Sequence, residues 1–157
     1  QNVHSLSLSF KVGRVVVFTQ GRFAGKKAVV IKAYEEGNKV HRFLSQKHRF
    51  PHLLVAGIAR HVPQVKRTDS KKKFIKKTSV KPFVKYVNQN HVLPTRFQVN
   101  DFDLKDIKDD NLKTKESRLA LRKTLRETFS KTLRELPNPK ENDKAGHTKF
   151  FFSRLRF

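Results

Sequence analysis

The sequence predicts a mainly β fold: a small β-barrel followed by an α-helical extension. Residues 1–100 contain five short apolar segments, rich in β-branched residues, with turn residues rather than helical patterns between them. Residues 116–136 then repeat leucine and phenylalanine at helical spacing. We therefore expect a barrel over residues 1–100, and a linker, a helix and an extended tail over residues 101–157.

The first two predicted strands form a hairpin with a basic tip. Residues 13–18 read Gly-Arg-Val-Val-Val-Phe, and residues 27–34 read Lys-Ala-Val-Val-Ile-Lys-Ala-Tyr. Between them, Gly21 and Gly25 can adopt the positive φ that tight turns need. We expect the tip to present the side chains of Arg22, Lys26 and Lys27 for contact, with Phe23 beside them for stacking or docking.

Three more segments complete the predicted barrel. Residues 52–59 form an apolar run, and residues 83–87 and 96–99 alternate apolar and polar side chains as strands do. Pro94 has no amide donor, so the element that contains it must be an edge strand or the start of a strand.

The charge of the chain points to a polyanionic partner. Its 157 residues include 36 Lys+Arg and 13 Asp+Glu, a formal net charge of +23. Residues 1–100 hold 21 basic and 3 acidic residues, a difference of +18, and residues 101–157 hold 15 and 10, a difference of +5. Such an excess repels itself unless a partner neutralises it, which disfavours a stand-alone metabolic enzyme.

Two long basic loops, residues 37–51 and 66–82, are expected to carry much of this contact. Residues 66–85 hold nine basic residues and one acid, interleaved with apolar side chains. A lone lysine pair is usually a solvated face, and the triplet at residues 71–73 also fits a nuclear-localisation signal. The density of the run favours nucleic-acid contact through Lys66, Arg67, Lys71, Lys72, Lys73, Lys76, Lys77 and Lys81.

The helix and the tail are expected to dock on other molecules. The apolar stripe of the helix is more typical of a protein-docking face than of a cofactor site, and it consists of Leu121, Leu125, Phe129, Leu133 and Leu136. Residues 149–157 alternate aromatic residues with cations and are too short to form a core. RNA offers both bases and phosphates to such a tail, so we expect stacking or docking by Phe151, Phe152 and Phe157.

The sequence offers little for catalysis, metals or cofactors. Cysteine is absent, and Pro51 interrupts the helix that would place His48 and His52 on one face. Asp109 and Asp110 more often offset a helix dipole than form a catalytic pair. The turn from Gly21 lacks the Gly-Lys-Ser/Thr ending of a phosphate-binding loop, and the longest apolar runs cannot span a bilayer. We expect no catalytic residues, no metal, no cofactor and no small-molecule substrate.

Four blocks resemble one family. The hairpin resembles a KOW motif. With it, His-Leu-Leu-Val-Ala-Gly-Ile (52–58), Phe-Val-Lys-Tyr-Val-Asn-Gln-Asn-His-Val-Leu-Pro-Thr-Arg-Phe (83–97) and Lys-Phe-Phe-Phe-Ser-Arg-Leu-Arg-Phe (149–157) resemble the twenty-seven-e family of large-subunit proteins of eukaryotic cytosolic ribosomes. The resemblance implies an SH3-like barrel and a structural role in which the protein binds ribosomal RNA.

The same resemblance implies partners and contacts. The partners would be large-subunit ribosomal RNA and neighbouring ribosomal proteins, the latter through the helix 116–136. The location would be the cytosolic ribosome, with nuclear and nucleolar passage during assembly. Motif matches place RNA contacts on Arg14, Arg22, Lys26 and Lys27, the lysines of residues 71–77, His91, Thr95, Arg96, Arg154 and Arg156.

Two other classes of function remain open. A KOW-type transcription-elongation or RNA-processing factor would need a protein-binding domain beside the barrel, and this chain has little room for one. A basic membrane-surface protein would need a helix with an all-basic polar face. Residues 116–136 include Glu116, Glu127 and Glu135, so we expect no membrane partner.

Overall fold

The computed structural model describes residues 9–34, 50–60, 62–63, 65–100, 102, 104, 107, 112–136 and 143–155. Most of the predicted loop 37–51 lies outside these residues. The chain divides into two compact units. The first comprises residues 1–57 and 84–98, and the second comprises residues 58–83 and 99–157.

Five strands form one sheet, in the order β4-β3-β2-β1-β5. Their bounds are β1 Arg14–Phe18, β2 Lys27–Tyr34, β3 His52–Ile58, β4 Pro82–Asn88 and β5 Val92–Gln98. Antiparallel pairing joins β1 to β2, β1 to β5 and β2 to β3. The mainly β fold with a helical extension is confirmed, and the five strands lie within a few residues of the predicted segments.

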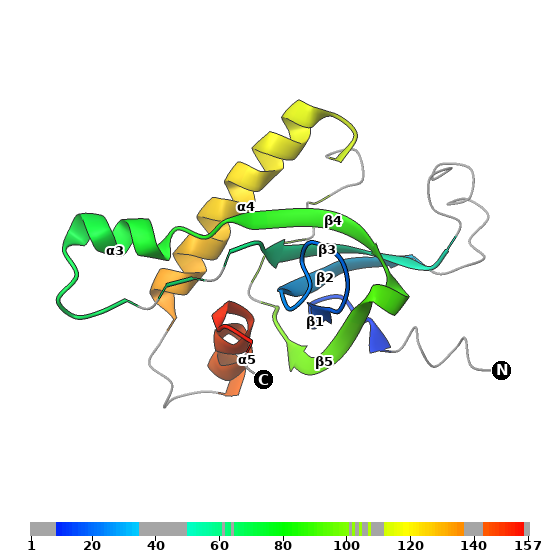
Figure 1. The fold of residues 1–157 in the computed structure, drawn as a ribbon, viewed down its shortest axis with the longest axis horizontal. Coiled ribbons are helices and arrows are strands. Elements are labelled where there is room, and N and C mark those ends of the chain that lie inside the picture. Colours follow the sequence, from blue (N-terminus) through cyan, green and yellow to red (C-terminus); the bar gives the residue numbers. More distant parts are fainter. Residues whose placement is uncertain are drawn as a thin grey trace. The chain divides into compact units, whose positions relative to one another are not determined.

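The two outer strands of the sheet follow each other in the chain. Only the single turn of 3₁₀-helix η1 (Gln89–His91) separates β4 from β5, and the ribbon bends sharply there (Figure 1). A sheet whose edge strands are joined so closely must curl, as in a small barrel. Pro94 lies opposite Val16 in the outer strand β5, so the expected edge position is confirmed.

The core of the first unit comes from the three inner strands of the sheet, β1, β2 and β3. Every residue of β3 is buried, as are the first five residues of β2. After Lys27 and His52 these buried stretches consist of Val, Leu, Ile and Ala, with Gly57 in β3, so the β-branched residues that favour a strand also supply buried surface. Val15 and Val16 of β1 are fully buried beside them.

The described residues of the second unit form three helices: α3 (Lys71–Thr78), α4 (Lys115–Glu135) and α5 (Asp143–Phe152). The helix predicted over 116–136 is confirmed as α4. It begins at an N-cap, where the hydroxyl oxygen of Thr114 accepts a hydrogen bond from the amide of Ser117 at 3.2 Å. The prediction that residues 66–82 form a loop is wrong over residues 71–78, where α3 lies. No helix in the described ranges is long and apolar enough to span a bilayer.

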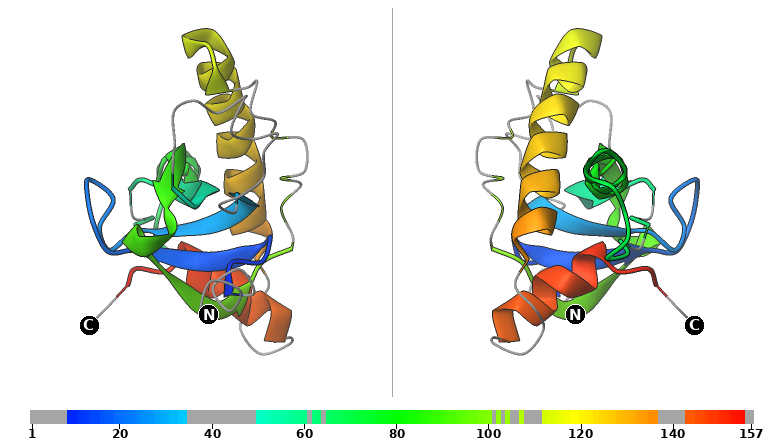
Figure 2. Two further views of the ribbon diagram at one scale, coloured as in Figure 1. Left: turned by 90° about the vertical axis from the view of Figure 1, so that its right-hand side faces the viewer. Right: turned by 90° about the vertical axis from the view of Figure 1, so that its left-hand side faces the viewer.

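An aromatic cluster forms the core of the second unit. Phe129 of α4 and Phe151 of α5 are almost fully buried, with ring centroids 5.5 Å apart. Phe102 lies 4.7 Å from Phe129, and Phe152 lies 5.1 Å from Phe151. Both ribbon views show α5 beside the C-terminal half of α4 (Figure 2). Aromatic rings at these separations add to the burial of their own surface.

This cluster corrects two expectations about residues 101–157. The predicted linker supplies buried side chains, because Phe102, Leu104 and Ile107 are each at most 8% exposed. The predicted extended tail is wrong over residues 149–152, which form the last turn of α5. A segment too short to form a core alone completes one contributed by segments remote in the sequence.

The apolar stripe of α4 has a different role from the one expected. Leu121, Leu125 and Phe129 are buried within this chain, and Leu133 and Leu136 are partly buried. The stripe predicted to dock on a neighbouring protein is therefore largely covered by the chain's own residues. An amphipathic pattern identifies a buried face of a helix, but it does not say whether that burial is intramolecular.

Candidate nucleic-acid interface

The tip of the β1–β2 hairpin is held by its glycines. Gly21 and Gly25 have φ of 81° and 72°, so the expected positive values are confirmed. The amide of Gly25 donates to the carbonyl of Phe18 at 2.8 Å, and the amide of Ala24 donates to that of Gly21 at 3.0 Å. A Cβ at either glycine would meet no atom within 4 Å, so the turn requires glycine for its backbone angle rather than for space.

The side chains of the tip differ in exposure. Arg22 is exposed and Lys26 is partly buried. The ring of Phe23 packs edge-on against Phe18 with centroids 6.2 Å apart, which anchors the tip on β1. Of the predicted contacts in this loop, Arg22 is thus the cation most open to a phosphate, and Phe23 has a structural neighbour within the hairpin.

Lys27 and Arg14 do not belong to the basic tip. Lys27 is the first residue of β2, lies opposite Val17 and is only 4% exposed. Desolvation by burial lowers the pKa of its amine to about 8. Arg14 is partly buried, and its Nη1 donates to the carbonyl of Ser9 at 2.8 Å. The prediction that Lys27 is displayed at the tip is wrong, because this first residue of β2 is buried.

The predicted contacts in η1 and β5 also divide into exposed and packed side chains. His91 and Arg96 are exposed, and the guanidinium carbon of Arg96 lies 5.2 Å from the ring centroid of Phe97. The hydroxyl of Thr95 donates to the carbonyl of Val15 at 2.7 Å, across the β1–β5 pair. Thr95 therefore has a role in the sheet, while His91 and Arg96 face solvent.

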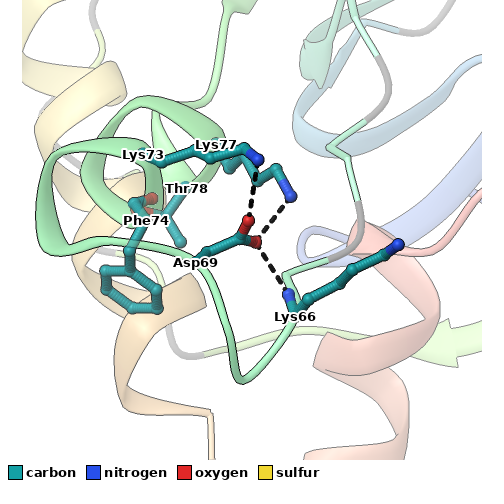
Figure 3. A network of polar contacts seen from close by, with 6 residues as sticks. All are labelled: Lys66, Asp69, Lys73, Phe74, Lys77 and Thr78. Carbon is teal, nitrogen blue, oxygen red and sulfur yellow. Dashed lines mark hydrogen bonds and ion pairs between the residues drawn. The ribbon is translucent and has the colours of Figure 1, made fainter.

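Around α3, one acid organises the basic run. The Asp69 side chain is 3% exposed, and Lys77 Nζ lies 2.6 Å from its Oδ2. Lys73 Nζ lies 3.2 Å from Oδ1, and the amide of Lys66 donates to Oδ2 at 2.8 Å (Figure 3). The hydrogen bond from Lys77, followed by that from the Lys66 amide, holds the pKa of the Asp69 carboxyl well below its usual range.

This network separates the lysines of α3 into two sets. Lys73 and Lys77 follow Asp69 by about one and two helical turns, and both neutralise its carboxylate. Lys71, Lys72 and Lys76 are exposed, and no carboxylate pairs with them in the part of the chain that the structure describes. These three cations, with the exposed Lys66, Arg67 and Lys81, are those best placed to meet phosphates.

The end of the chain is only partly described. Phe151 and Phe152 are 1% and 6% exposed within the aromatic cluster, so they are not displayed for base stacking. Arg154 is exposed. The predicted sites at Arg156 and Phe157 lie outside the described residues.

One group of cations was not singled out by the sequence patterns. Lys123, Arg126 and Arg134 of α4 line a hollow beside the segment that follows α3. Three positions separate Lys123 from Arg126, and eight separate Arg126 from Arg134. This spacing places all three on the side of the helix away from the leucine stripe, and it could have identified them from the sequence. Histidines and carboxylates of the described residues form no group able to hold a metal ion.

Comparison with known proteins covers nearly the whole chain. The Ribosomal L27e protein family matches residues 15–157, from the hairpin to the last residue. The chain belongs to this family. The resemblance of four separate blocks to the twenty-seven-e family is thereby confirmed.

Curated L27e relatives align over almost their full length. The large ribosomal subunit protein eL27 of Tetrahymena thermophila is 47% identical over 149 residues, which are 94% of this chain and 96% of that protein. The eL27B protein of Saccharomyces cerevisiae is 36% identical over 148 residues, and the eL27 protein of Solanum tuberosum is 37% identical over 155. Both alignments again cover 94% of this chain and 96% of the relative.

Proposed function

We propose that this protein is a structural constituent of the large ribosomal subunit and binds ribosomal RNA there without catalysing a reaction. The match to the L27e family over residues 15–157 carries the proposal. The net charge of +23 and the exposed cations of the hairpin, α3 and β5 support it, since they suit the phosphates of a large RNA.

The proposed partners are large-subunit ribosomal RNA and neighbouring ribosomal proteins. The leucine stripe of α4 is largely buried, so protein contacts would use other surfaces of the chain. The proposed location is the cytosolic ribosome, reached after assembly in the nucleus and nucleolus. A KOW-type elongation or RNA-processing factor has no supporting observation among the relatives.

Sedimentation of the tagged chain tests the proposal. In a sucrose gradient of cell lysate, the protein should travel with the large subunit, resist moderate salt and leave at high salt, because many phosphates are neutralised together. Recovery mainly in free or polymerase-associated fractions would overturn the ribosomal role.

A pair of variants adds a comparison at constant charge. Replacing Lys71, Lys72 and Lys76 by Gln should lower the salt concentration at which half of the protein leaves the subunit. The control replaces Lys113, Lys115 and Lys131 by Gln. These substitutions remove the same charge from exposed positions in and next to α4. Equal effects of the two triple variants would show that α3 contributes only net charge.

A further inference from the structure

An open hollow of about 380 Å³ lies on α4, beside the segment that follows α3. Its lining residues are Ser79, Lys123, Arg126, Glu127, Ser130 and Arg134. Three cations and one carboxylate give this lining a formal charge of +2. We propose that the hollow binds a backbone phosphate of RNA. This inference deepens the proposed function and rests on RNA being the partner.

The hollow is built on one side of α4. Its five residues from that helix are spaced by three, four, seven and eleven positions from Lys123, which brings them to the same face. The leucine stripe faces elsewhere and is buried. The polar face of α4 is thus shaped by the segment after α3, which supplies the remaining side of the hollow.

Hydroxyl groups brace both guanidinium groups. Arg126 donates to Ser79 Oγ from Nε at 2.9 Å and from Nη2 at 2.6 Å. Arg134 donates from Nε to Thr78 Oγ1 at 3.1 Å, and that hydroxyl donates to the carbonyl of Phe74 at 3.0 Å. Ser79 and Thr78 therefore set the positions of two long, otherwise mobile side chains.

A third hydroxyl fixes the segment itself. The amide of Val80 donates to Ser130 Oγ at 3.1 Å, and both residues are buried. Three consecutive residues, 78 to 80, are thus each tied to α4. Because the braced arginines have already lost much of their side-chain freedom, less entropy remains to be lost when an anion binds.

The chemistry of the braces is what indicates a ligand. A carboxylate partner would orient an arginine and also cancel its charge, whereas a neutral hydroxyl orients it and leaves the charge intact. Neither guanidinium pairs with a carboxylate in the described part of the chain. Of five N–H donors each, Arg126 uses two and Arg134 one, so three and four remain in the described contacts.

These remaining donors match a phosphate. The planar guanidinium fork binds phosphate oxygens in pairs, and the nearby ammonium of Lys123 adds charge without a geometric demand. Ser79 directly follows α3, so the hollow continues from the exposed lysines of that helix. An RNA backbone supplies several phosphates in succession and can contact both. An acidic protein segment is the competing occupant, and the experiment below separates the two.

Affinity for a fluorescein-labelled RNA hairpin tests the site in the full-length chain. Arg126→Gln and Arg134→Gln should each weaken binding about tenfold at fixed salt and lower the salt slope by about one. Ser79→Ala, which changes no charge, should weaken binding about threefold, and Ser79→Thr should restore it. Arg122→Gln is the matched control, since Arg122 is exposed on α4 outside the hollow. Thermal unfolding of each variant checks that it is folded.

Protection of arginines from phenylglyoxal, read by mass spectrometry, locates the ligand. RNA should protect Arg126 and Arg134 more than Arg122, and inorganic phosphate alone should protect them weakly. Stronger protection by polyglutamate than by RNA would overturn the inference in favour of an acidic protein. If the wild type binds RNA, and Arg126→Gln, Arg134→Gln and Ser79→Ala bind it no more weakly than Arg122→Gln, the hollow is overturned while the proposed function stands. A wild type that fails to bind RNA overturns the proposed function itself.

Discussion

At the scale of single residues, backbone angles were easier to predict than exposure. Gly21 and Gly25 were identified because few other residues adopt positive φ in a tight turn, and both do so. Lys27 was misplaced because a lysine beside a glycine-rich turn is usually exposed. In the fold it opens the buried strand β2 and is only 4% exposed. A local pattern contains the angle preference of a residue but not the neighbours that cover its side chain.

Burial of Lys27 makes stability depend on pH in an alkaline window. The pKa of its amine falls from 10.5 in the unfolded chain to about 8 in the fold. Between these values the unfolded state binds more protons, so stability rises with pH from about 8 to about 10.5. Below pH 8 the amine is charged in both the folded and the unfolded chain, and burial then disfavours the folded state.

Lys27→Met should therefore stabilise the protein at pH 7, by roughly 1 to 3 kcal/mol, since the cost of burying the charge disappears. Urea unfolding measured at pH 7 and pH 10 checks this, with Lys26→Met as the less buried control. The gain should shrink toward pH 10. A gain that is the same at both pH values would mean that charge burial is not its source.

At the scale of elements, α3 shows how one acid changes the structure of a basic run. A helix of eight residues is too short to be stable alone in water, and five lysines would repel each other in it. Asp69 stands just before its N-terminus, where a negative charge suits the helix dipole, and reaches Lys73 and Lys77. The density of lysines along the sequence predicted a loop, because the prediction did not consider that this single carboxylate could neutralise two of them.

Asp69→Asn should loosen α3. The folded pKa of this carboxyl lies below its unfolded value, so its contribution is present above pH 4 or so and is lost as the pH falls through the folded pKa. Hydrogen exchange at pH 7 should be faster at residues 71–78 in the variant. Glu135→Gln, an exposed carboxylate in α4, serves as the control. Unchanged protection of α3 would show that Asp69 does not maintain the helix.

At the scale of the whole molecule, the chain builds two cores by different routes. The core of the first unit comes from strands that the sequence pattern identifies one by one. That of the second unit gathers Phe102, Phe129 and Phe151 from an irregular segment and two helices. The helix and the tail, which were expected to dock on other molecules, instead bury each other together with Phe102 of the predicted linker.

Phe151→Ala should unfold or strongly destabilise the second unit. Removing a ring that is 1% exposed costs about 3 to 5 kcal/mol, because the cavity cannot close fully. Phe150→Ala, at a partly buried position one residue earlier, should cost clearly less. Thermal unfolding of the two variants measures the difference. Similar losses would contradict the assignment of Phe151 to the core.

The sequence by itself determined the five strands, the long helix, the turn glycines, the basic character and the family. Each of these depends on local preference, on periodicity or on a run of residues in order. Only the tertiary structure decided that the aromatic tail is buried, that Asp69 pairs with two of the α3 lysines, and that serine and threonine brace Arg126 and Arg134. The aromatic contacts and the arginine braces join residues up to 56 positions apart, and the pairing of such remote groups follows from how the chain packs. The partners of Asp69 are only four and eight positions away, but they reach it because residues 71–78 fold into a helix.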